Sequence, residues 1–186
     1  MTDPLPEQRI SECGKAMAIA AVPVYTVNGA VHPPTLIAAC ARMAGYYLLR
    51  SFGVVTTSMK PGEAVLSPQA SEKTPVLLRT CVGVLATLGN SIPSDPPQPL
   101  IDEKTIPCED FLQTQARLLP VFAPLRAKFS LDEYQAARAA AVATAIAAHA
   151  VRTNIDVTRS IGVAAFGFTE GSRTVPTPAG DDKNAV

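Results

Sequence analysis

The sequence has no tryptophan, only two histidines and no excess of either charge. Lysine plus arginine and aspartate plus glutamate both total 16, so the formal net charge is zero. A protein that binds nucleic acid or an anionic membrane ordinarily carries a basic excess, so we expect neither kind of partner. The low aromatic content of 5% argues against a strand-rich fold, because strands concentrate aromatic and β-branched residues.

The short motifs that carry chemistry are also missing. No C-x-x-C or H-x-x-x-H pair supplies the local ligands of a metal site, and the sequence contains neither a P-loop nor a G-x-G-x-x-G pattern. We therefore expect no metal and no cofactor. Scattered cysteines in apolar stretches are typical of small buried hydrophobes rather than of a disulfide framework. The four here are Cys13, Cys40, Cys81 and Cys108.

Long apolar runs are lacking as well. No uninterrupted run approaches the roughly 18 residues that a membrane span needs. The N-terminal stretch MTDPLPEQR is acidic and contains proline, unlike the basic start of a signal peptide. These features predict a cytoplasmic protein without a membrane partner.

What the sequence has in abundance is alanine, the best helix former. Apolar residues recur at steps of three and four, which predicts amphipathic helices, and the 17 prolines cluster between these runs. We expect one helical domain over residues 1–171 and a disordered tail over 172–186. The helices are expected from Asp3 to Pro23, from Pro34 to Phe52, from Thr74 to Gly89, from about Pro107 with Pro120 and Pro124 kinking or dividing it, from a capping box at Ser130 to Arg152, and from Asp156 to Glu170.

The predicted fold is all-α, an irregular or orthogonal bundle of five to six helices. The second, third and fifth helices are so apolar that we place them at the centre. Either the other helices cover them, or a second copy of the chain buries part of their surface. Together with the missing catalytic motifs, the second alternative favours a non-catalytic homo-oligomeric interaction or scaffold protein, most simply a dimer.

The alternative hypothesis is a binding protein or enzyme for a small anionic ligand. Four arginines stand almost alone in otherwise apolar helices, and a buried guanidinium must be paired. They could form structural ion pairs or reach solvent, or several could converge on a cavity and bind a carboxylate or phosphate. These candidate ligand-binding residues are Arg42, Arg50, Arg79 and Arg138.

Two further groups complete the candidate site. His149 lies in the apolar stripe of the fifth helix, where it is either a core histidine or a general base, and His32 precedes the second helix. The connection over residues 53–73 is long enough to be functional. Within it, Lys60 and Glu63 flank a Pro-Gly turn that presents a cation and a carboxylate, although the segment could also be a simple hairpin. Whether any chemistry occurs is left open.

Overall fold

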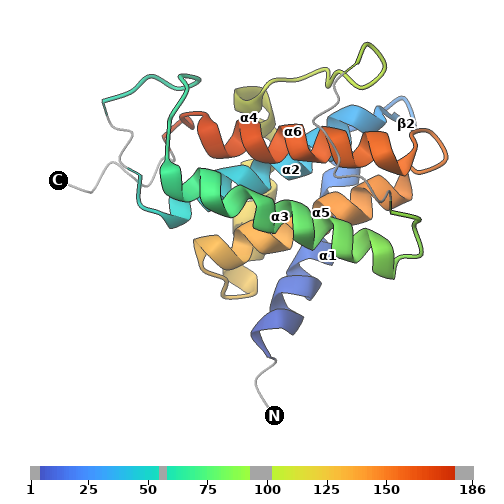
Figure 1. Ribbon diagram of the computed structural model, residues 1–186, viewed down its shortest axis with the longest axis horizontal. Coiled ribbons are helices and arrows are strands. Elements are labelled where there is room, and N and C mark those ends of the chain that lie inside the picture. The colour runs from blue at the N-terminus through green and yellow to red at the C-terminus, as the bar shows by residue number, and fades with distance from the viewer. Residues whose placement is uncertain (1–4, 55–57, 93–101, 179–186) are drawn as a thin grey trace.

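The computed structural model describes residues 5–54, 58–92 and 102–178. In these residues it has six α-helices and one short antiparallel hairpin (Figure 1). The predicted all-α bundle is therefore confirmed. The elements are α1 (Pro6–Val24), β1 (Thr26–Val27), β2 (Ala30–Val31), α2 (Pro33–Ser51), α3 (Pro68–Thr87), α4 (Phe111–Lys128), α5 (Glu133–Ala150) and α6 (Val157–Arg173).

Helix α2 is the centre of the bundle. Every residue from Pro34 to Leu49 is buried, and the helix packs mainly against α5 and α6, which Figure 1 shows with α6 in front of α2. The predicted central place of α2 and α5 follows from their apolar character on all sides. In the described part of the chain, none of the helices is long and apolar enough to pass through a bilayer.

The backbones of α2 and α6 meet closely because both helices carry glycine at the contact. A Cβ added to Gly45 of α2 would lie 2.5 Å from the carbonyl oxygen of Phe168. A Cβ added to Gly171 of α6 would lie 2.8 and 2.9 Å from the carbonyl carbon and Cα of Arg42. The backbone of α6 thus approaches α2 closely at Gly45.

Helix α3 lies further out than we expected. It buries only Ala70, Leu77, Cys81 and Leu85, at spacings that describe one narrow stripe, and the remaining residues face solvent or are half-buried. Helix α6 takes the inner position instead, since ten of its residues are buried. The apolar composition of α3 misled the prediction because apolar side chains can also lie at the edge of a core, where Leu78, Val82 and Val84 are only partly buried.

Two predicted helix boundaries are wrong. Ser130 does not cap α5; it has a positive φ of 51° and closes the end of α4. The capping box is formed two residues later by Asp132 and Gln135. Helix α4 is not divided, since it continues through Pro120 and Pro124. Both prolines are exposed, so water can satisfy the carbonyls that they leave without an N–H partner.

Two other boundaries also differ from the prediction. Helix α3 begins six residues before the expected Thr74, where the Ser67 hydroxyl accepts from the Ala70 N–H. The cap expected at Asp3 lies outside the described residues. The tail was expected to begin at residue 172, but Val175 is 1% exposed and exchanges backbone hydrogen bonds with the segment over residues 62–63. Ser172 and Val175 are thus buried, residues 179–186 lie outside the described part, and the boundary of the tail stays a prediction.

Candidate functional site

Arg42 is a structural residue. It is 2% exposed, and its Nε donates to Glu170 at 2.6 Å. Its Nη1 donates to the Glu109 carbonyl at 2.7 Å and to the Thr114 hydroxyl at 3.3 Å. These bonds use three of its five guanidinium N–H donors. They join α2 to α6 and to the turn before α4, and they pair a charge whose burial would otherwise be costly.

The other three arginines are also separate from one another. Arg50 lies 3.4 Å from a Glu133 oxygen, which Arg126 shares at 2.7 Å. Arg138 makes a two-bond contact with Glu7 near the start of α1, at 2.7 and 2.8 Å. Arg79 is exposed on α3 and forms no salt bridge with a described residue. The structure therefore does not bring the four arginines together around a ligand.

His149 and the turn at residues 60–63 are occupied by local hydrogen bonds. The Nδ1 of His149 lies 3.0 Å from the Asn90 amide nitrogen, a contact that joins the end of α5 to the end of α3. The Lys60 N–H donates to the Glu63 carboxylate at 3.1 Å, and the side chains of both residues are exposed. The expected Pro-Gly turn is present, but the segment pairs with the C-terminal strand-like residues rather than with itself.

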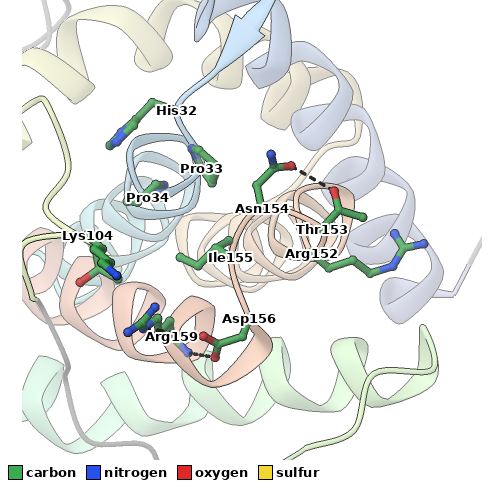
Figure 2. A pocket seen from close by; sticks show the side chains of 11 residues that line it. His32, Pro33, Pro34, Lys104, Arg152, Thr153, Asn154, Ile155, Asp156 and Arg159 are labelled. Carbon is green, nitrogen blue, oxygen red and sulfur yellow. Dashed lines mark hydrogen bonds and ion pairs between the residues drawn. The ribbon is translucent and has the colours of Figure 1, made fainter.

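Among the residues selected from the sequence, His32 lines a cavity. This cavity has a volume of about 590 Å³, within the range usual for small-molecule sites. It opens where α2 begins, α5 ends and α6 begins (Figure 2). Its walls are His32, Pro33, Pro34, Lys104, Thr105, Arg152, Thr153, Asn154, Ile155, Asp156 and Arg159.

The cavity lining holds three permanent cations against one carboxylate. Figure 2 shows His32, Lys104 and Arg159 around one side, while the Arg152 guanidinium extends away on the other. Arg152 donates to the His149 carbonyl at 2.9 Å. Lys104 forms no salt bridge within the described ranges. Lys104 and Arg159 are therefore the cations best placed to meet a ligand.

Arg159 is held in place by two carboxylates. It lies 3.5 Å from Asp102 and 3.7 Å from Asp156. The Thr105 hydroxyl, which hydrogen-bonds to the Asp102 carboxylate, is the main reason that the pKa of Asp102 lies below its usual range. Asp156 in turn caps α6, since its carboxylate accepts from the Arg159 N–H. Both contacts of Arg159 are long and exposed to solvent, so they position its guanidinium at the rim of the cavity. They are weaker than the short, buried contacts that Arg42 makes.

A hydrogen-bonded cluster of His32, Thr35 and Cys108 lies at the edge of the cavity. The Nδ1 of His32 is 2.7 Å from the Thr35 hydroxyl and 3.4 Å from the Cys108 sulfur. The Thr35 hydroxyl also accepts from the Cys108 N–H at 2.9 Å. The threonine thus fixes both the imidazole and the cysteine backbone. In the described residues, no group of three potential ligands is arranged for a metal ion.

Sequence reasoning missed most of this site. Cys108 was expected in a helix and buried, but it lies in the turn before α4 and is exposed. Lys104, Arg152 and Arg159 were not singled out because they sit in or next to polar connections, where charges are ordinary. His32 and Cys108 are 76 residues apart, so no local pattern links them. The only available signal was the Pro-Pro pair after His32, which marks a helix start.

The fold and the site together define a six-helix bundle with an open, cation-bearing cavity at one end of its central helix. Comparisons with protein-family models, with curated proteins and with solved structures found no match to this chain.

Proposed function

We propose that the chain binds a small anionic molecule in the cavity at the start of α2 and α6. The observation that supports this most is the pair of cations, Lys104 and Arg159, on a wall that contributes a single carboxylate. A carboxylate or phosphate can accept hydrogen bonds from both side chains, and an arginine can bind it through two parallel bonds. The proposed ligand is still the small anion predicted from the sequence. The side chains proposed to bind it differ from the four arginines that the sequence suggested.

The rest of the lining restricts the ligand further. Pro33 and Pro34 have no N–H groups, so the start of α2 offers few backbone donors to an anion. Their rings and Ile155 present apolar surface instead. We therefore expect a ligand that joins an anionic group to an apolar or planar body. Because Lys104 is exposed and Arg159 is half-exposed, binding should weaken as the salt concentration rises.

Phenyl phosphate and its neutral counterpart phenol are suitable probes, with affinity measured by calorimetry at low salt. Replacing both Lys104 and Arg159 with alanine should weaken phenyl phosphate binding by about tenfold, which corresponds to about 1.4 kcal/mol. Arg79→Ala is the matched control, because it removes an exposed cation that does not line this cavity and should leave binding unchanged. Equal binding by the double variant, or equal affinity for phenol, would contradict the proposal.

Homodimerisation and a cytoplasmic location stay predictions. The dimer was inferred from the apolar surfaces of the second, third and fifth helices, and in the structure most residues of α2 and α5 are buried within one chain. The cytoplasm is supported by four free cysteines, which a reducing compartment maintains as thiols. Light scattering across a range of protein concentrations tests the dimer, and a constant monomer mass would exclude it.

A further inference from the structure

Three of the four cysteines are expected to be unreactive in the folded chain. Cys13, Cys40 and Cys81 are all 0% exposed. Burial raises the pKa of the Cys13 thiol to about 11 and that of Cys40 and Cys81 to about 12. Because the thiolate is the nucleophile, these groups are both inaccessible and protonated. Cys108 differs from them, since it is exposed and has an imidazole beside it.

The position of Cys108 is built into the fold. On its N-terminal side, Thr105 is 1% exposed and bonds to Asp102. On its C-terminal side, the buried Arg42 donates to the Glu109 carbonyl at 2.7 Å. The Cys108 N–H itself is bound to Thr35. The turn is thus fastened at three successive points, which holds the sulfur within hydrogen-bonding distance of His32.

We propose that Cys108 and His32 form a nucleophilic thiol–imidazole pair that exchanges with small anionic disulfides. His32 Nδ1 takes the thiol proton, and the Cys108 thiolate attacks one sulfur of the disulfide R–S–S–R. The old S–S bond breaks as the new one forms. The departing R–S⁻ leaves with the electron pair and is protonated by the imidazolium. Cys108 is oxidised to a mixed disulfide, and one R–S group is reduced to a thiol.

The geometry favours disulfide exchange over acyl transfer. Acyl transfer needs N–H donors directed at a developing oxyanion, and the Cys108 N–H is already bonded to the Thr35 hydroxyl. Disulfide exchange needs only an accessible thiolate and a good leaving group. The other three cysteines are buried and cannot resolve the product, so the mixed disulfide persists until an external thiol reduces it. Cys108 is thus a site of reversible S-thiolation.

The preference for an anionic disulfide depends on the proposed cavity, whereas the reactivity of the pair does not. His32 both contacts Cys108 and lines the cavity, so a disulfide bound at the sulfur can extend past His32 into the cavity that Lys104 and Arg159 line. An acidic peptide disulfide, with carboxylates on flexible arms, has the required chemistry. Its acid groups can bind Lys104 and Arg159 while its sulfur meets Cys108.

The test uses two aromatic disulfides on the freshly reduced full chain, the dianionic dithiobis-nitrobenzoate and the neutral dithiodipyridine. The release of coloured thiol gives the rate, and the intact mass gives the number of modified cysteines. We expect one modification per native chain, since one of the four cysteines is exposed, and none in Cys108→Ser. His32→Asn should slow both reagents by at least about tenfold, because the base is lost.

A second set of variants separates the pair from the cavity. Replacing Lys104 and Arg159 with alanine should slow only the dianionic reagent, and Arg79→Ala should affect neither. Unchanged rates in both His32→Asn and His32→Gln, with the native circular dichroism retained, would overturn the pair. One modification per chain persisting in Cys108→Ser would also overturn it. If the double alanine variant slows both reagents equally or neither, the anionic preference is wrong and the proposed ligand cavity fails with it.

Discussion

Replacing Gly171 with alanine should destabilise the protein, although alanine is the better helix former. The added methyl group would approach the carbonyl carbon and Cα of Arg42 to 2.8 and 2.9 Å. Normal carbon contacts are about 3.5–4.0 Å. Both obstacles are backbone atoms of Arg42, which lies in the fully buried stretch of α2 from Pro34 to Leu49, so no side chain can rotate to make room. The helices α2 and α6 must separate instead.

The size of the effect follows from two opposing contributions. Overpacking a tight core typically costs about 1–3 kcal/mol and sometimes more. The helix propensity of alanine over glycine returns about 1 kcal/mol or slightly less. Because the contact is backbone on backbone, we place the overpacking at or above the upper end of its range. The net loss in the free energy of unfolding should be about 2 kcal/mol.

Gly83 of α3 is the matched control. It also lies inside a helix, but a Cβ there would meet no atom within 4 Å. Gly83→Ala should therefore show the propensity gain alone, a stabilisation of about 0.5–1 kcal/mol. Urea unfolding followed by far-UV circular dichroism measures both variants. If Gly171→Ala is as stable as the parent, or shifts in the same direction as Gly83→Ala, then α2 and α6 are not in close backbone contact and the reasoning is refuted.

Three further perturbations test the ion pairs and the helix cap. Arg42→Leu should cost about 3 kcal/mol of unfolding free energy in a urea titration, because it strands the Glu170 carboxylate; a loss below that of an ordinary surface substitution would show that the pair is dispensable. The Arg138 hydrogen bond lowers the pKa of Glu7, so the pair stabilises the fold above the ordinary glutamate pKa and this small contribution disappears as the pH falls through the lowered one. In Arg138→Ala, an NMR titration should find the Glu7 pKa raised towards its usual value, and an unchanged pKa would mean that the pair does not form in solution. Asp132→Ala should cost about 1 kcal/mol in thermal or urea unfolding by removing the cap of α5, whereas no change would place the cap elsewhere.

The helices could be predicted from the sequence because their signal is local. Apolar spacing of three and four residues, together with the prolines between runs, places most of the helices within a few residues, although α3 begins six residues earlier than expected. The start of α5 is a boundary that the local sequence alone does not determine. Ser130 and Asp132 are both good caps, and each is followed three residues later by a suitable partner, Glu133 or Gln135. Only the end of α4, which requires the positive φ at Ser130, decides between them.

The candidate site could not be predicted because its contacts are not local. Arg42 and its partner Glu170 are 128 residues apart, so the sequence indicated that Arg42 needed a partner without indicating which one. Arg79 was misread for another reason. A lone charge in an apolar helix can mark a buried site, but in α3 it marks the side that faces solvent. His32, which was selected because it precedes a helix, lines the cavity, and its role there stays a prediction. Its neighbour Cys108 became visible only when the chain was folded.

The cavity walls come from three segments that only the folded bundle brings together, residues 32–34, residues 104–105 and residues 152–159. A ligand of this cavity therefore binds the native state and cannot bind the unfolded chain, which lacks the arrangement. By mass action, a ligand present at about 100 times its dissociation constant adds about 2.7 kcal/mol to the free energy of unfolding. A rise in the melting temperature of the protein therefore reports the binding of a candidate ligand. A compound library can be screened for such a thermal shift. Compounds that raise the melting temperature of the parent, but not that of the Lys104 and Arg159 double alanine variant, would be candidate ligands of the cavity.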